Sequence, residues 1–314
     1  MPFEKSTEAL LPKKGFYARV VGSVGSTLII VAFSLLLGSA GYAYFVADEP
    51  TLSDVPYGSV GDISLRLDFY EPTKRQQERP LIIWVHGGAW RSGTKSGVPI
   101  VKLRDQGFAI ASVDYRLSPV AKFPAQIHDI KSAIRFLRAN ADRFGVDTDR
   151  FVLAGSSAGG HLAVLAAVSE GVPELRGNLE TDDKITSGVQ AVVSFYGAGN
   201  LQTILAQSTP FGLGVRVPAL ELFLGGLPDK EPTLARLASP VEHIDARDPP
   251  LWLFHGDQDP QMPINQSHEL VGAYKKVGLP VQIEVIYGGK HGGSGFFTDD
   301  QLQRLGNELL GSLR

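Results

Sequence analysis

The chain has 314 residues, of which 43% are hydrophobic, and a formal net charge of −3. This length suits one large domain or two smaller ones, and the slightly acidic balance gives no indication of a nucleic-acid partner. The sequence has no cysteine, which excludes disulfide bonds, thiolate catalysis and cysteine-ligated metals.

The first distinctive segment is a stretch without charged residues over residues 20–47, with basic residues before it and acidic residues after it. About 20 mostly apolar residues span a bilayer, and the more positive flank stays in the cytoplasm. The pattern therefore predicts a cytoplasmic tail over residues 1–19, a transmembrane signal anchor over 20–47, and a domain on the non-cytoplasmic side of the membrane.

Two other interpretations of this stretch stay open. A signal peptide cleaved after Ala43 would leave a secreted or periplasmic domain, and Gly41-Tyr42-Ala43 is a weak small-x-small site for such cleavage. A buried core helix is the third interpretation, and the length of the uncharged stretch argues against it.

Downstream of the membrane segment, strand-like and helix-like runs alternate, which predicts an α/β fold over residues 52–314. Several of the strand-like runs are continuously apolar, as in strands buried on both faces of a parallel sheet. We therefore expect a mostly parallel central sheet with helices on both faces. The expected strands cover residues 64–70, 81–85, 108–113, 151–154, 189–195, 251–254 and 281–286, and the expected helices cover residues 124–143, 264–276 and 299–313.

A glycine pair follows the second expected strand, in the sequence His86-Gly87-Gly88-Ala89-Trp90. Glycines at such a position let backbone N–H groups approach a ligand oxygen without a Cβ in the way. We expect Gly87 and Gly88 to supply part of an oxyanion hole, and the alternative is an ordinary turn.

The sequence Gly155-Ser156-Ser157-Ala158-Gly159 stands between an apolar strand and a helical pattern. A G-x-S-x-G motif in this strand-to-helix context is typical of a nucleophile elbow. The context favours Ser157 as a nucleophile, with the N–H of Ala158 as a further oxyanion donor. An isolated Gly/Ser-rich turn is the competing interpretation.

Residues 201–238 interrupt the alternation with glycine, proline and scattered apolar residues. We expect an irregular, cap-like insertion over the carboxyl edge of the sheet, where ligands bind in open α/β sheets. Such an insertion is a source of substrate selectivity.

A nucleophilic serine needs a base and an acid, which follow it in the order acid, then histidine, on this kind of fold. Asp257 and Asp259 both follow the expected strand at 251–254, and Asp259 is favoured because it lies further along the loop. His291 follows the last expected strand in a glycine-flanked loop and is the expected base. The other histidines fit structural or surface roles.

These motifs are joined by further stretches, and together they resemble the α/β-hydrolase superfamily. The resemblance is to its esterase/lipase branch of the hormone-sensitive-lipase type, and within that branch to the bacterial feruloyl/acetyl-xylan esterase-like group. It implies a Ser157, Asp259 and His291 triad with an oxyanion hole of Gly87, Gly88 and Ala158. The matching stretches are residues 67–72, 86–93, 114–119, 123–126, 155–162, 255–256 with Asp259, and 291–293. The resemblance further implies structural roles for His86, Asp114, Arg116 and Asp129.

The leading hypothesis is a serine hydrolase that cleaves carboxylic esters of small molecules through an acyl-enzyme, without a cofactor or a metal. No H-E-x-x-H motif or paired His/carboxylate cluster is present in the sequence. A formamidase or peptidase of the same fold is the alternative enzyme, and a catalytically idle binding protein is the alternative of another class. The sequence leaves the acyl and alcohol parts of the substrate and the oligomeric state open.

Overall fold

The computed structural model describes residues 49–74, 79–177 and 184–314, so the predicted tail and membrane anchor over residues 1–47 lie outside the described residues. Within the described ranges, no helix has both the length and the apolar composition that crossing a membrane requires.

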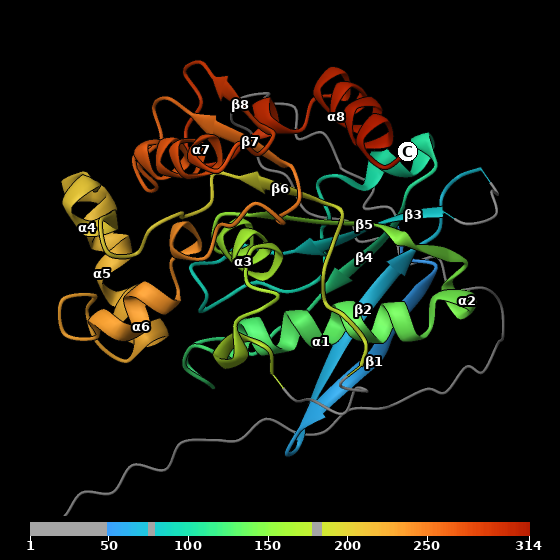
Figure 1. Cartoon of the computed structure of the whole chain (residues 1–314), viewed down its shortest axis with the longest axis horizontal. Helices are drawn as coiled ribbons and strands as arrows, with labels where there is room; N and C mark the ends of the chain where they lie inside the picture. The colour runs from blue at the N-terminus through green and yellow to red at the C-terminus, as the bar shows by residue number, and fades with distance from the viewer. Residues whose placement is uncertain (1–48, 75–78, 178–183) are drawn as a thin grey trace, which may run out of the picture. The chain divides into compact units, whose positions relative to one another are not determined.

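Eight strands form one sheet in this part of the chain, in the order β1-β2-β4-β3-β5-β6-β7-β8 (Figure 1). β1 pairs antiparallel with β2, and β2 antiparallel with β4, whereas all other neighbours are parallel. The predicted mostly parallel sheet is confirmed. The strands are β1 (Leu52–Val60), β2 (Ile63–Tyr70), β3 (Arg79–Val85), β4 (Ala109–Val113), β5 (Val146–Ser156), β6 (Ala191–Phe195), β7 (Leu251–Gly256) and β8 (Val281–Ile286).

β1 was not among the expected strands. It is an edge strand whose residues are mostly exposed, and its pairing with β2 has two register irregularities. Pro56 within it suits an edge, where one side of the strand needs no ladder donor. The strand therefore lacks the apolar pattern that identifies the others.

The central strands alternate their side chains between two apolar layers. On β3, Leu81, Ile83 and Val85 face the layer that holds residues of α1, α3 and α7. Ile82 and Trp84 face the other layer, which holds residues of η1 and α8. Both faces of the sheet are thus covered, as predicted. The helices of these layers are α1 (Ala125–Ala139), α2 (Ala141–Phe144), α3 (Ala158–Ala167), α7 (Asn265–Lys276), η1 (Val101–Gln106) and α8 (Asp299–Ser312).

The single helix expected over residues 124–143 is divided into α1 and α2 at Asn140. The side-chain amide of Asn140 donates to the carbonyl of Phe136 at 2.8 Å, so this residue takes up a carbonyl of the last turn of α1. Asparagine commonly ends helices by such local hydrogen bonds.

No helix was expected over residues 201–238, but the segment is largely helical. It contains α4 (Ile204–Gln207), α5 (Pro210–Leu224) and α6 (Pro232–Leu237), which gather on one side of the sheet in Figure 1. Glycines and Pro218 lower the helix propensity of α5, and exposed Phe211 and Leu222 obscure its apolar face. Three short 3₁₀ helices complete the described elements: η2 (Pro173–Leu175), η3 (Pro240–Glu242) and η4 (Ser294–Phe296).

Candidate active site

Ser157 lies at a strained turn between β5 and α3. Its φ of 53° is in the left-handed region, which residues other than glycine rarely adopt. A Cβ on Gly155 would lie 2.5 Å from the backbone of Gly159, and a Cβ on Gly159 would lie 2.0 Å from the carbonyl oxygen of Val85. Both glycines are therefore required for β5, α3 and β3 to approach closely enough to form this turn.

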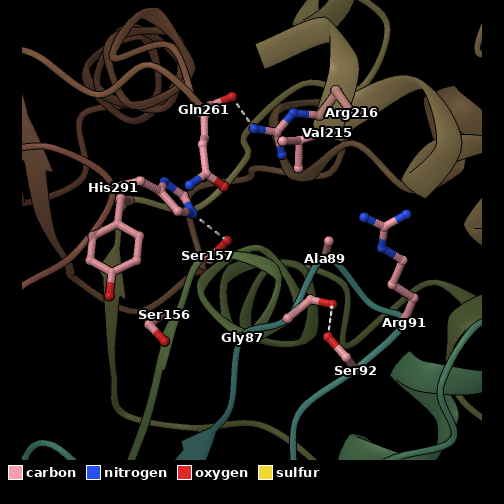
Figure 2. A pocket seen from close by; sticks show the side chains of 12 residues that line it. Gly87, Ala89, Arg91, Ser92, Ser156, Ser157, Val215, Arg216, Gln261 and His291 are labelled. Carbon is pink, nitrogen blue, oxygen red and sulfur yellow. Dashed lines mark hydrogen bonds between the residues drawn. The ribbon is translucent and has the colours of Figure 1, made fainter. Parts of the chain in front are cut away.

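A chain of hydrogen bonds joins three of the predicted residues. Ser157 Oγ lies 2.8 Å from His291 Nε2 (Figure 2), and His291 Nδ1 lies 2.7 Å from Asp259 Oδ2. The other carboxylate oxygen of Asp259 accepts from the N–H groups of Gln261 and Met262 at 2.8 and 2.9 Å. Asp257 instead accepts from the N–H of Gly288. The geometry thus links Asp259, and not Asp257, to the histidine.

The electrostatics of Asp259 keep it ionised. Burial raises the pKa of this carboxyl, but hydrogen bonding from His255 and His291, the charge of His291 and the N–H of Met262 outweigh burial. The pKa of Asp259 therefore lies well below its ordinary value. An ionised Asp259 holds the N–H of His291 on Nδ1, which leaves Nε2 as the acceptor that faces Ser157.

The other six histidines make hydrogen bonds away from Ser157 or are exposed. His255 is fully buried, with Nδ1 2.7 Å from Ser267 Oγ and Nε2 2.9 Å from the carbonyl of Met262, so it holds the loop that carries Asp259. His268 is exposed on α7. His86, His128, His161 and His243 each lie within hydrogen-bond distance of a backbone carbonyl.

The loop after β3 lies against the elbow. A Cβ on Gly87 would meet the carbonyl oxygen of Ser156 at 2.9 Å and Cβ of Ser157 at 3.4 Å, so only a glycine fits here without displacement. Within the described residues, the N–H groups of Gly87, Gly88 and Ala158 donate to no protein acceptor. Unpaired N–H groups next to a serine hydroxyl are the donors that a developing oxyanion requires.

Trp90 anchors this loop. It is fully buried, its indole N–H donates to His161 Nδ1 at 3.1 Å, and its ring stacks on Phe223 of α5 at 4.7 Å. The carbonyl of Trp90 accepts from both the N–H and the hydroxyl of Ser118. Ala89 and Trp90 both have positive φ, and these contacts hold that unfavourable backbone in place.

The serine opens into a cavity of about 370 Å³. Figure 2 shows His291 and Gln261 on one side of it, Arg91 and Ser92 on the other, and Val215 and Arg216 above. The complete lining is Gly87, Gly88, Ala89, Arg91, Ser92, Ser156, Ser157, Tyr196, Val215, Arg216, Gln261 and His291. Of the residues predicted for the oxyanion hole, Ala158 is buried behind this surface.

Sequence reasoning missed the upper part of the cavity. Val215 and Arg216 belong to α5, which was not recognised as a helix. Gln261 lies in the loop after β7 that carries Asp259, here called the acid loop, and was not singled out there. Tyr196 follows β6, and its ring packs edge-on against His291 at 4.8 Å. No motif marks these four residues. In the described ranges, no group of histidine and carboxylate side chains is arranged to hold a metal ion.

Comparison with curated proteins finds esterases. The chain is 33% identical to esterase LipQ of Mycobacterium tuberculosis over 231 residues, which are 72% of this chain and 53% of that protein. The chain spans about half the length of the first curated relatives that it matches.

Two solved structures are similar over most of this chain. A truncated carbohydrate esterase from gut microbiota has a TM-score of 0.74 and 29% identity, covering 83% of this chain and 95% of that one. A propionate-bound esterase from the Planctomycetes species Thermogutta terrifontis has a TM-score of 0.65 and 27% identity, covering 82% and 92%. Together with the sheet and the elbow, these likenesses identify an α/β-hydrolase fold of the esterase/lipase branch.

The model of the BD-FAE family matches residues 67–274 of this chain. The match begins in β2 and ends in α7, so it includes Gly87 and Gly88 after β3, the elbow, α5 and the acid loop. The chain therefore belongs to the BD-FAE family.

Proposed function

We propose that this protein is a serine hydrolase that cleaves carboxylic esters through an acyl-enzyme. The observation that carries the proposal is the hydrogen-bonded series Ser157, His291 and Asp259, which opens into the cavity beside unpaired backbone N–H groups. The esterase relatives support the same reaction class.

In the acylation step, His291 Nε2 takes the hydroxyl proton of Ser157 while Oγ forms a bond to the ester carbonyl carbon. The carbonyl oxygen becomes an oxyanion that accepts hydrogen bonds from the N–H groups of Gly87, Gly88 and Ala158. Asp259 stays ionised and stabilises the imidazolium of His291. The carbon–oxygen bond to the alcohol then breaks, and His291 returns the proton to the departing oxygen.

In the deacylation step, a water molecule replaces the alcohol. His291 takes a proton from that water as its oxygen attacks the acyl carbon, and the second tetrahedral intermediate uses the same N–H groups. Collapse of this intermediate breaks the bond to Ser157 Oγ, which regains its proton from His291. The products are one carboxylic acid and one alcohol.

The size and lining of the cavity favour a compact acyl group. A cavity of about 370 Å³ is near the small end of ligand pockets, and Val215, Ala89 and Tyr196 are the apolar or aromatic residues among its lining. The similar Thermogutta terrifontis esterase holds propionate, which is consistent with a short acyl chain here. We therefore propose esters of short-chain or otherwise small acids as substrates.

A substrate series tests this function. Purified protein is given 4-nitrophenyl acetate, butyrate and decanoate, a feruloyl ester, an N-formyl arylamine and a peptide anilide, and kcat/KM is measured for each. We expect the highest values for acetate and butyrate. Turnover of the formamide or anilide without any turnover of the esters would contradict the proposal.

We also propose that residues 20–47 anchor the enzyme in a membrane with the hydrolase domain on the non-cytoplasmic side. The proposal rests on the uncharged stretch and its flanking charges alone. Full-length protein should sediment with membranes and resist extraction by high salt, and protease added to spheroplasts should reach the domain. Recovery in the soluble fraction would contradict the anchor, and a mature N-terminus at Tyr44 would show a cleaved signal peptide instead.

A further inference from the structure

Arg216 is a buried cation at the border of the cavity. Only 2% of the residue is exposed, and its guanidinium lies beside Val215 and Gln261 above Ser157 (Figure 2). Nη2 donates to the carbonyl oxygen of Gln261, and the buried Nε has no hydrogen-bond partner. A buried guanidinium normally has more partners than this, because each unsatisfied donor costs free energy.

No carboxylate neutralises Arg216. Among the described residues it forms no salt bridge, and the nearby Asp259 has both oxygens engaged by His291 and the N–H groups of its own loop. Burial lowers the pKa of Arg216 to about 10, a shift that the charge of Asp259 partly opposes. The guanidinium therefore stays charged at neutral pH without a paired anion.

A second cation borders the same cavity from the opposite side. Arg91 follows the oxyanion loop, is partly exposed, and its guanidinium makes no hydrogen bond or salt bridge with any other described residue. Figure 2 shows its side chain extending along the wall below Arg216. The lining contains two arginines and no aspartate or glutamate. Cavities that carry one sign of charge attract ligands of the opposite sign.

The position of Arg216 is fixed by contacts between α5 and the acid loop. The hydroxyl of Thr209 at the start of α5 donates to the carbonyl of Pro260 at 2.8 Å. A Cβ on Gly212 would lie 2.9 Å from that same carbonyl oxygen, so the helix and the loop are in close contact. Because Asp259 lies in this loop and contacts His291, these contacts also hold Arg216 at a fixed position relative to Ser157 and His291. A group held in this way loses little entropy when it binds a ligand.

We propose that the preferred substrates are esters that carry a carboxylate, which binds Arg216 and Arg91 while the ester carbonyl lies at Ser157. This inference rests on the proposed ester hydrolysis and adds the charge of the substrate to it. The carboxylate supplies the anion that the buried guanidinium lacks, and charge-assisted hydrogen bonds of this kind are stronger than neutral ones. The carboxylate belongs either to the acyl part or to the alcohol part of the ester.

Two matched pairs of esters test the proposal and separate these two sources. The acyl-side pair is 4-nitrophenyl hydrogen succinate and its neutral methyl ester. The alcohol-side pair is 4-acetoxybenzoate and its neutral methyl ester. For each pair, kcat/KM of the anionic ester is divided by that of the neutral one, and the ratio is compared between wild type and variants, so that intrinsic reactivity cancels.

The pair whose carboxylate lies on the side of the ester that contacts the arginines should respond. For that pair we expect the ratio to fall at least about tenfold in Arg216→Gln and by a smaller factor in Arg91→Gln, as for the loss of a hydrogen bond to a charged group. Arg216→Lys, which keeps the charge, should retain part of the ratio. The matched control is Arg304→Gln on α8, which removes an exposed arginine paired with Glu284 and should leave both ratios unchanged.

Unchanged ratios for both pairs in Arg216→Gln and Arg91→Gln would overturn the proposal while leaving ester hydrolysis intact. If Arg216→Gln does not fold, the ratios are measured in Arg216→Lys and Arg91→Gln instead. Ratios equal to those of wild type in both of these variants would also overturn the proposal. Absence of turnover of all four esters, anionic and neutral, by wild type would instead refute the proposed function itself.

Discussion

The cavity has two regions that differ in how they are built. Its floor consists of Gly87, Ser157 and His291, which stand in the segments that follow strands β3, β5 and β8. Its upper wall consists of Val215 and Arg216 from α5 together with Gln261 from the acid loop. The floor is shaped by backbone geometry, whereas the wall is shaped by side chains that a helix and a loop project over it.

This difference indicates that the floor carries out the reaction and that the wall determines which esters are preferred. In the proposed mechanism, the floor supplies the hydroxyl, the base and the unpaired N–H groups that any ester would use. The wall holds a cation that only some esters would use. Changes in the floor should therefore lower the turnover of all esters alike, and changes in the wall should alter the ratio between esters.

The largest effect is expected for Ser157→Ala. In the proposed mechanism, Ser157, His291 and Asp259 act as a unit. We therefore expect kcat to fall by about four orders of magnitude or more for every ester, with the ratio between esters unchanged. The control Ser156→Ala should retain most of the activity, since its hydroxyl is one residue away from the turn. Steady-state hydrolysis of 4-nitrophenyl acetate measures both, and near-wild-type turnover by Ser157→Ala would refute the mechanism.

A loss of about three orders of magnitude or more is expected for His291→Ala, while the exposed His268→Ala should behave as wild type. In wild type, kcat/KM should decrease as the pH falls into the mildly acidic range, because a protonated base cannot accept the serine proton. The lowered pKa of Asp259 keeps this carboxyl ionised in that range, so one proton should account for the acid limb. A wild-type profile for His291→Ala would move the base elsewhere.

A smaller loss, about tenfold to a hundredfold in kcat, is expected for Gly87→Ala. The new Cβ would lie 2.9 Å from the carbonyl of Ser156 and would displace the loop whose N–H groups face the serine. Gly272→Ala is the matched control, because a Cβ there meets nothing within 4 Å. An equal effect of the two substitutions would contradict the assignment of this loop to the oxyanion.

The smallest effect concerns His161, which contacts Trp90 below the cavity, and it is measured as a change in the free energy of unfolding. Burial lowers the pKa of His161 to about 4, only partly offset by its hydrogen bond to Ala238. The folded pKa is below that of an unfolded histidine, so this stability is present above about pH 6.5 and is lost as the pH falls toward 4.

Urea unfolding at about pH 7 and pH 5 should show a loss of about 2 kcal/mol that is attributable to His161. His161→Gln keeps a polar side chain that does not titrate, so its free energy of unfolding should depend less steeply on pH. The same slope in wild type and variant would mean that other groups account for the acid sensitivity.

The two regions also explain what the sequence could predict. The elbow, the glycine loop and the histidine loop could be identified because sterics restrict the residue types there, as the positive φ of Ser157 and the close contacts of Gly155 and Gly159 illustrate. Every described strand except β1 was expected from its apolar residues, which are buried in β3 to β7 and only partly buried in β8. Arg216 could not be predicted, since an arginine on an unrecognised helix has no local signature, and its role depends on how α5 packs on the acid loop.

The claim that Ser157 is the nucleophile of the floor is tested most directly by covalent labelling. Protein is exposed to a fluorophosphonate probe, and its intact mass and digested peptides are measured by mass spectrometry. We predict the addition of one phosphonyl group on the peptide that contains Ser157, with no addition in Ser157→Ala or after unfolding in urea. An unlabelled wild type that hydrolyses esters, or a label on any other residue, would contradict the account.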